Sequence, residues 1–317
     1  MTKKLIVSSV LIIFFAFLGI NYIREQFLPV SLDSKSIDFL IPKGASVSTI
    51  GNNLEKKGLI KNSIGFKFYV QVTNSQNKIQ AGEFQLSPSL SLIQVVDQLK
   101  KGPKEIWVTI PEGLRKEEIA AKFAVTLEKD QIFIDEFLDL TVDSEGYLFP
   151  ETYLFPKTAT AAQVVNKLIS TFNLKIEKVT YQQLIMASML ERETFSDSEK
   201  PIVAGVLYKR IENGWPLQVD ATLQYAKDSA KYKVQSAENK YWDPIYSLDK
   251  EIDSAFNTYK NLGLPPSPIA SPGLSSIQAA INPESSDYWY YIHDSDGKIH
   301  FAKTLEEHNQ NIDKYLK

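Results

Sequence analysis

The chain has 317 residues, a length that allows about two domains. Its 44% hydrophobic and 23% charged residues are the proportions of an ordinary globular protein, and a net charge of -3 argues against nucleic acid as a partner. The sequence has no cysteine, which excludes disulfide bonds, thiol chemistry and cysteine-based metal sites.

The first predicted element is a membrane-spanning helix at residues 5–23, which contain no charged side chain. As a helix this run would be roughly 28 Å long, close to the thickness of the hydrocarbon core of a bilayer. Residues 1–4 include two lysines, which predict a cytoplasmic N-terminus and an extracytoplasmic position for the rest of the chain. The alternative is a cleaved signal peptide, which is disfavoured because no small-x-small site follows the apolar run.

Residues 24–37 are a predicted linker, and residues 38–103 are a predicted small α+β module. The elements expected in the module are a strand from Phe39, a helix through Val47, Ile50 and Leu54, a helix over Ile64–Val72, a strand ending at Leu86, and a helix through Leu92, Val95, Val96 and Leu99. Small strands that alternate with helices in this way indicate one sheet covered by helices.

Residues 104–317 are predicted to form a larger mixed α+β domain. It opens at Val108 with a strand, a Pro-x-Gly turn and a helix, the pattern that also starts the module; such a repeat is most simply structural. The later predicted elements are helices over Asp130–Asp139, Ala161–Phe172, Tyr181–Phe195, Asp197–Asn213, Ser275–Ile281 and Leu305–Leu316, and a hairpin of Tyr288–His293 with Lys298–Ala302.

Three segments of this domain are predicted to be mainly irregular. Ser144–Thr158 is aromatic, is broken twice by proline and carries Glu145 and Glu151, which suits a sugar-binding groove or an ordinary packed loop. Lys227–Asp253 is polar and is a candidate flap or insertion. Phe256–Pro283 is rich in proline, and long ordered loops of this kind are usually functional.

The helix predicted over Tyr181–Phe195 carries an apolar face to a carboxylate. The apolar positions that recur at three- and four-residue spacing are Ile185, Met186, Met189 and Leu190. Glu193 is the next position on this face, whereas Glu191 lies on another. A carboxyl on an apolar face loses hydration, which raises its pKa as a general acid near neutral pH requires. The alternative is that Glu193 ends a buried stripe, pairs with Arg192 or Lys200 and has no chemical role.

Several catalytic motifs are missing from the sequence, which contains no phosphate-binding loop, GxGxxG, GxSxG or HExxH. The histidines are His293, His300 and His308, all near the end of the chain. We expect His293 and His300 to face solvent or each other across the hairpin, and we expect no metal site and no cofactor. Acid chemistry on carboxylates remains, with amide and hydroxyl side chains for binding.

Some stretches of the chain are weak signals alone but specific when taken together: EGYLFPETY, MASMLERET, VAGVLYKRIENGWPLQVDATLQY, FNTYKNLGLPPSPIASPG and IHFAKTLEEHN. In this order and spacing, over Ile106–Leu316, they resemble the YceG-like (MltG) family of endolytic murein transglycosylases. Residues 5–23 fit the family's membrane helix, and residues 38–103 are similar to its LysM-like subdomain. The resemblance implies cleavage of the MurNAc–GlcNAc bond of nascent peptidoglycan without water. The products would carry 1,6-anhydro-MurNAc ends, and cleavage would terminate strand elongation.

The resemblance also implies roles for individual residues. Glu193, the second glutamate of the E-x-E-T motif, would be the catalytic residue, the same residue that the helical phase selects. It would act as acid and then as base on the MurNAc C6 hydroxyl, so one carboxylate suffices where an ordinary glycosidase needs two. Phe256 stands where the family often has tyrosine. The expected substrate-binding residues are Glu151 of the aromatic segment and Gln218, Asp220, Asn257, Thr258 and Tyr259 of the matching motifs.

The expected partners are peptidoglycan glycan strands, the synthases of the elongation or division machinery, and the plasma membrane through residues 5–23. Two alternatives remain open. One is a glycoside hydrolase of the same substrate in which Asp220 or Glu191 positions a water molecule. The other is a non-catalytic peptidoglycan-binding scaffold.

Overall fold

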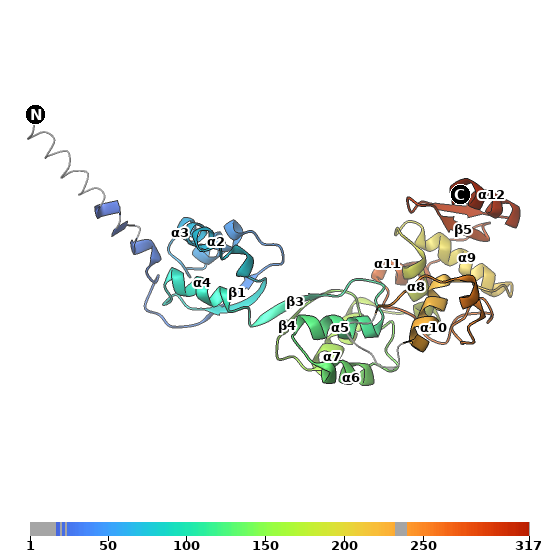
Figure 1. Cartoon of the computed structure of the whole chain (residues 1–317), viewed down its shortest axis with the longest axis horizontal. Coiled ribbons are helices and arrows are strands. Elements are labelled where there is room, and N and C mark those ends of the chain that lie inside the picture. The colour runs from blue at the N-terminus through green and yellow to red at the C-terminus, as the bar shows by residue number, and fades with distance from the viewer. Residues whose placement is uncertain (1–16, 20, 23, 232–239, 317) are drawn as a thin grey trace, which may run out of the picture. The chain divides into compact units, whose positions relative to one another are not determined.

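The computed structural model describes the chain except for residues 1–16, 20, 23, 232–239 and 317 (Figure 1). The described residues combine helices with a four-stranded and a two-stranded sheet, which confirms the predicted α+β class. The predicted membrane helix at residues 5–23 lies largely outside the described residues. Among the helices that are described, none has the length and apolar character needed to cross a membrane.

The chain divides into two units. The first unit ends at Trp107 and also takes in Leu154–Lys157. The second unit comprises Val108–Tyr153 and Thr158–Lys317. The residues that form the candidate site described below all belong to the second unit.

One sheet has the strand order β1-β2-β3-β4. Its strands are β1 (Ile37–Ile41), β2 (Gly82–Leu86), β3 (Glu105–Thr109) and β4 (Thr152–Pro156). β1 and β2 are antiparallel, with Phe39 opposite Phe84, and β2 is antiparallel to β3. Gly82 has a φ of 147°, and a Cβ there would lie 2.1 Å from the carbonyl oxygen of Glu105, so this pairing requires glycine.

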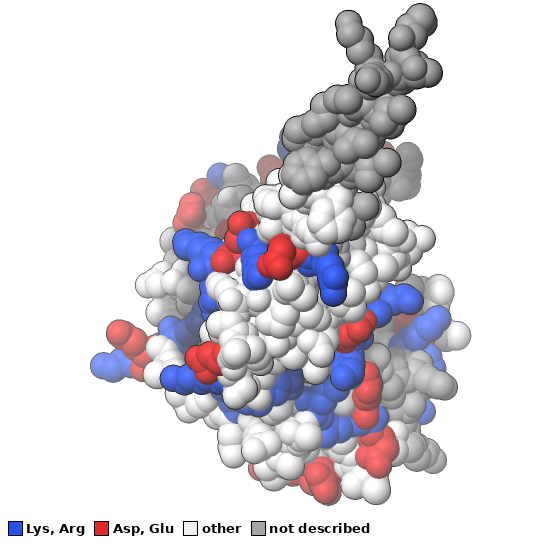
Figure 2. Space-filling model, turned by 90° about the vertical axis from the view of Figure 1, so that its left-hand side faces the viewer, with Lys and Arg blue, Asp and Glu red and all other residues white. Residues whose placement is uncertain are grey.

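The first unit also contains α2 (Val47–Lys56), α3 (Ser63–Val72), η1 (Gln76–Lys78) and α4 (Leu92–Lys100). The side chains of Ser46, Asn62 and Ser91 accept backbone N–H groups in the first turns of the three α-helices, which explains where these helices begin. Acidic and basic side chains are mixed on the face of the molecule that Figure 2 presents. This mixing agrees with a net charge of only -3.

The second unit is mainly helical. Its helices are α5 (Lys116–Thr126), α6 (Gln131–Leu140), α7 (Ala161–Lys175), α8 (Tyr181–Glu193), α9 (Lys200–Glu212), α10 (Asp220–Lys231), η2 (Ser247–Glu251), α11 (Leu274–Ile281) and α12 (Leu305–Tyr315). A separate antiparallel hairpin consists of β5 (Tyr290–His293) and β6 (Ile299–Ala302).

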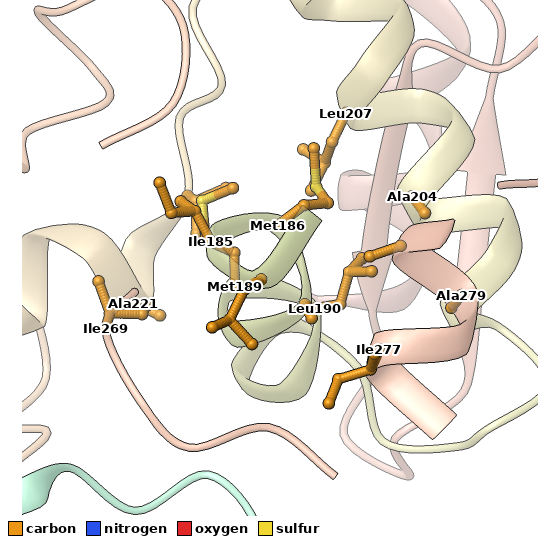
Figure 3. Close-up of a cluster of buried hydrophobic side chains, with 14 of the residues drawn as sticks. Ile185, Met186, Met189, Leu190, Ala204, Leu207, Ala221, Ile269, Ile277 and Ala279 are labelled. Atoms are coloured by element: carbon orange, nitrogen blue, oxygen red, sulfur yellow. The ribbon is translucent and has the colours of Figure 1, made fainter. Parts of the chain in front are cut away.

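Helix α8 lies in the core of the second unit, in contact with α9, α10 and α11 (Figure 3). Every side chain of α8 from Leu184 to Leu190 is buried, so the helix is covered on all sides rather than on one apolar face. Ser188 is tolerated there because its hydroxyl donates to the carbonyl of Ile185 and accepts the N–H of Ile269. α8 is therefore a rigid support for the glutamate at its end.

Helix α10 differs from the sequence prediction, which gave no helix there and treated the chain from Lys227 onward as irregular. Polar residues interrupt the apolar period of α10, because its buried side includes Thr222 and Asp228 beside Leu223. A helix buried partly through polar side chains does not show a clear apolar repeat. Within the candidate flap at Lys227–Asp253, residues 232–239 lie outside the described part of the chain.

Candidate active site

A pocket of about 710 Å³ opens at the C-terminal end of α8. Its wall combines residues of α8, α9, α10, α12, β5 and η2 with the loops before α10 and after η2. The lining side chains with polar or aromatic groups include Glu193, Arg210, Gln218, Asp220, Tyr259, Tyr290, Tyr291, His293 and His308. Carboxylates, an amide and aromatic hydroxyls in one open pocket suit a carbohydrate better than an apolar ligand.

Glu193 is the last residue of α8 and the most perturbed carboxyl in this pocket. Burial raises its pKa to about 7, and the nearby charge of Asp220 also raises it. The hydroxyl of Tyr291 donates to Glu193 Oε2 at 2.9 Å and opposes this shift, as does a hydrogen bond from the backbone N–H of Ala221. A carboxyl with a pKa near 7 can both give and take a proton at neutral pH.

Tyr291 stays protonated beside this carboxyl. Burial and the charge of Glu193 raise the pKa of the Tyr291 hydroxyl well above its ordinary value of 10. The hydroxyl therefore donates to Glu193 when the carboxyl is ionised, and this bond orients the carboxyl group.

Asp220 and Tyr259 form a second polar pair in the same pocket. The Tyr259 hydroxyl donates to Asp220 Oδ1, and burial together with this hydrogen bond raises the pKa of Tyr259. Asp220 is the first residue of α10, and Ala221 follows it. One helix start therefore supplies both the backbone donor to Glu193 and the carboxylate paired with Tyr259.

Gln218 has an exposed side chain in the pocket and a backbone φ of 54°, a left-handed conformation that is unfavourable for this residue. Its backbone N–H donates to the carbonyl of Thr258 at 3.1 Å, which holds the strained turn. Strained backbone of this kind occurs most often at functional sites.

Asn257 and Thr258, two predicted binding residues, are fully buried beneath this wall rather than part of it. The Asn257 amide donates to backbone carbonyls at 3.0 and 2.8 Å and its oxygen accepts the N–H of Tyr259. Thr258 Oγ1 accepts the N–H of Val219 at 3.0 Å and lies 2.9 Å from Thr222 Oγ1. These side chains position the Tyr259 and Asp220 segments.

Glu151 lies away from this pocket. Its carboxylate forms an ion pair with Lys175 of α7, and the hydrogen bond from Lys175 lowers the pKa of Glu151. Of the predicted binding residues, the structure therefore places Gln218, Asp220 and Tyr259 beside Glu193.

Glu191, the other glutamate of the motif, points into a different environment. Its Oε2 accepts the N–H of Gly273 at 2.8 Å and the hydroxyl of Ser276 at 2.7 Å, and Lys200 lies 3.5 Å from its Oε1. Glu191 therefore ties the start of α11 to α8, and it is Glu191 rather than Glu193 that pairs with Lys200.

Arg210 is the main site residue that sequence reasoning missed. It is buried, and its guanidinium donates to the carbonyl of Leu217 at 2.6 Å and to that of Trp289 at 3.0 and 2.7 Å. The sequence does carry one signal for its burial, because Arg210 follows the buried Leu207 by three residues and so lies on the same face of α9. The charge of Arg210 lowers the pKa of Glu193, against the effect of burial.

The histidines differ from the prediction that His293 and His300 face solvent or each other. His293 Nε2 lies 3.3 Å from Glu199 Oε1, and His300 Nε2 lies 2.8 Å from Asp294 Oδ2. The hairpin register places these histidines opposite isoleucines rather than opposite each other. Within the described residues, no group of three or more histidine, aspartate or glutamate side chains could hold a metal ion.

The sequence is similar to those of known proteins. Residues 39–314 match the YceG-like family. An endolytic murein transglycosylase of Bacillus subtilis (strain 168) is 33% identical, over 93% of this chain and 89% of that protein. An endolytic murein transglycosylase of Streptococcus pneumoniae serotype 2 (strain D39 / NCTC 7466) is 30% identical over 95% of this chain, which matches only 62% of that longer protein.

A solved structure is also similar. The 2.6 Å crystal structure of the yceG-like protein lmo1499 from Listeria monocytogenes has a TM-score of 0.52 and 30% sequence identity, and covers 88% of this chain and 99% of that one.

Proposed function

The chain belongs to the YceG-like family, and we propose that it is an endolytic murein transglycosylase. It cleaves the MurNAc–GlcNAc bond within nascent peptidoglycan strands and leaves 1,6-anhydro-MurNAc ends. The observation that carries this proposal is the half-buried carboxyl of Glu193, with a pKa of about 7, in an open polar pocket.

Glu193 acts first as the acid. Its proton passes to the glycosidic oxygen, the bond from that oxygen to the MurNAc anomeric carbon breaks, and the fragment that begins with the GlcNAc leaves as an alcohol. The resulting carboxylate then takes the proton of the MurNAc C6 hydroxyl, whose oxygen bonds to the anomeric carbon. The residue ends protonated, as it began, and no water is consumed. This is why one carboxylate suffices.

Asp220 supports the developing positive charge on the sugar ring. Its carboxylate lies in the same pocket and is held by the Tyr259 hydroxyl, so it need not reorganise during the reaction. Gln218 lies two residues before Asp220, in a turn that its backbone hydrogen bond fixes, and its side chain binds hydroxyl or amide groups of the sugar. Asn257 and Thr258 act through the positions of Tyr259 and Val219.

The proposed enzyme is anchored in the plasma membrane by residues 5–23, with residues 1–4 in the cytoplasm and the catalytic domain outside. The support is the uncharged run that follows two lysines. Residues 38–103 form a LysM-like module and residues 104–317 the catalytic domain; in the module, α2 and α3 lie in sequence between the paired strands β1 and β2. An anchored enzyme acting on nascent strands would work beside the synthases of elongation or division.

The pH dependence follows from the pKa of Glu193. The first step needs the protonated carboxyl, so the cleavage rate should fall as the pH rises through about 7. The Tyr291 hydrogen bond lowers this pKa, so Tyr291→Phe should move the falling limb to higher pH. Tyr290→Phe is the matched control, a pocket tyrosine that should leave the limb in place. An unchanged or lowered limb in Tyr291→Phe would count against Glu193 as the acid.

The activity itself is tested by incubating the full chain, solubilised in detergent, with un-crosslinked glycan strands and following strand length over time. An endolytic enzyme should produce fragments of intermediate length before short products appear. Binding to strands without any shortening would support the scaffold instead. Release of only the smallest products from strand ends would contradict the endolytic assignment.

A further inference from the structure

Two tryptophans form an aromatic pair beside the pocket, and the reaction described above does not use them. The ring centroids of Trp215 and Trp289 lie 4.5 Å apart with the planes inclined by 36°. Trp215 is 39% exposed. Its ring centroid also lies 6.1 Å from that of Tyr290, which lines the pocket. An exposed indole therefore lies next to Tyr290 at the edge of the pocket.

The backbone segments that carry the two tryptophans are both tied to one buried residue, Arg210. The backbone N–H of Trp215 donates to the carbonyl of Arg210 at 2.8 Å. The guanidinium of Arg210 donates to the carbonyls of Leu217 and Trp289. The loop that carries Trp215 and the strand segment that carries Trp289 are thus fixed to the same residue of α9. A platform fixed before binding loses little conformational entropy when a ligand stacks on it.

The two indole rings differ in how much of their surface a ligand could contact. The ammonium of Lys209 lies 4.4 Å from the ring centroid of Trp289, so that ring is covered by Lys209 and by Trp215. Trp215 is 39% exposed, so part of its indole surface remains available to a ligand. Trp215 also lies three residues before Gln218, in the loop that enters the pocket.

We propose that Trp215 is a sugar-stacking residue that adds a subsite for an N-acetylated hexose of the glycan strand to the pocket around Glu193. This rests on the proposed function, because the ligand is the same glycan. The flat face of the indole packs against the C–H groups of a sugar ring, and the Trp289 ring supports it from behind. A subsite outside the reacting bond affects long strands and spares short ones.

The proposal is tested by titrating full-length Glu193→Gln, solubilised in detergent, with a short and a long peptide-free glycan oligosaccharide, using calorimetry. In this background, Trp215→Ala should weaken binding of the long oligosaccharide about 5-fold, the loss of one aromatic contact, and leave the short one unchanged. Trp215→Phe should retain most of the affinity. Tyr246→Ala, which removes another exposed aromatic outside the pocket wall, should change neither.

The possible failures are distinct. If Glu193→Gln binds the long oligosaccharide and Trp215→Ala binds it equally well, the subsite is refuted and the proposed function stands. An equal loss for both oligosaccharides would mean that Trp215 only packs the Gln218 loop, which also refutes the subsite. If Glu193→Gln binds neither oligosaccharide, the subsite fails together with the assignment of the pocket to glycan.

Discussion

Glu193→Gln is expected to abolish strand cleavage while leaving the fold intact. Glutamine cannot give the proton to the glycosidic oxygen or take one from the C6 hydroxyl, and each lost proton transfer costs about 10²–10⁴-fold in rate. The side chains are similar in size, and the Tyr291 hydroxyl can still donate to the amide oxygen. The measurements are the initial rate of strand cleavage and the midpoint of thermal unfolding. The midpoint should equal or exceed that of the unchanged protein, because a carboxyl that resists ionisation has been replaced by a neutral group.

Glu191→Gln is the matched control two residues away. It weakens charged hydrogen bonds to Gly273 and Ser276 and should lower the free energy of unfolding by about 1–3 kcal/mol. Its cleavage rate per folded molecule should fall only mildly, because Glu191 faces α11 rather than the pocket. A loss of activity as large as that of Glu193→Gln would contradict the choice between the two glutamates.

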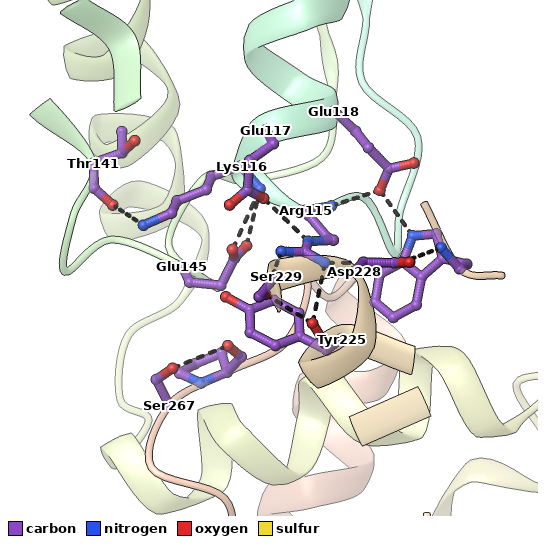
Figure 4. A network of polar contacts seen from close by, with 12 residues as sticks. Arg115, Lys116, Glu117, Glu118, Thr141, Glu145, Tyr225, Asp228, Ser229 and Ser267 are labelled. Atoms are coloured by element: carbon purple, nitrogen blue, oxygen red, sulfur yellow. Dashed lines mark hydrogen bonds and ion pairs between the residues drawn. The ribbon is translucent and has the colours of Figure 1, made fainter. Parts of the chain in front are cut away.

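Arg115→Met should give the largest loss of stability, about 3–5 kcal/mol, because it leaves buried carboxyls without their cation. Arg115 is 1% exposed in a polar network shown in Figure 4. Its Nε lies 3.1 Å from Glu117 Oε2, its Nη2 donates to Ser229 Oγ at 2.9 Å, and its Nη1 lies 4.0 Å from Asp228 Oδ2. The measurement is unfolding by urea at neutral pH.

The same network connects Arg115 to the candidate site through α10. Asp228 and Ser229 lie in the last turns of this helix, and Asp220 is its first residue. Loosening the C-terminal end of α10 should therefore displace Asp220 and lower activity as well. Burial and then the charge of Glu117 raise the pKa of Glu145, another carboxyl of the network, to about 8, which favours its neutral form at pH 7.

Arg115→Lys separates charge from geometry in this network. It keeps the positive charge but not the planar set of donors, so it should recover part of the lost stability. A destabilisation by Arg115→Met below about 1 kcal/mol would show that the network contributes little to folding.

Local periodicity predicted much of the fold and part of the site. The helical phase of Ile185 to Leu190 predicted different surroundings for Glu193 and Glu191, and the structure places one at the pocket and the other against α11. The apolar face expected of α8 is instead burial on every side. The predicted helices and the β5–β6 hairpin are present because their caps, apolar repeats and turn residues lie within a few positions of one another. The assignment of Glu193 as the catalytic residue and the domain boundaries remain predictions.

The rest depends on contacts between distant residues. Tyr291 reaches Glu193 across 98 positions, and Arg115 reaches Ser229 across 114 positions. Periodicity within one segment carries no information on such pairs. It also could not show that Glu151 pairs with Lys175 or that Asn257 is buried, because both residues look like exposed polar positions in the sequence.

The most direct measurement of the proposed chemistry is digestion of un-crosslinked glycan strands by the full chain in water labelled with heavy oxygen, followed by mass spectrometry of the new ends. Attack by the MurNAc C6 hydroxyl predicts anhydro ends that carry no labelled oxygen and a mass lower by one water than that of a reducing end. Reducing ends that carry one labelled oxygen per cut would contradict this, because water would then be the nucleophile and the protein a glycoside hydrolase.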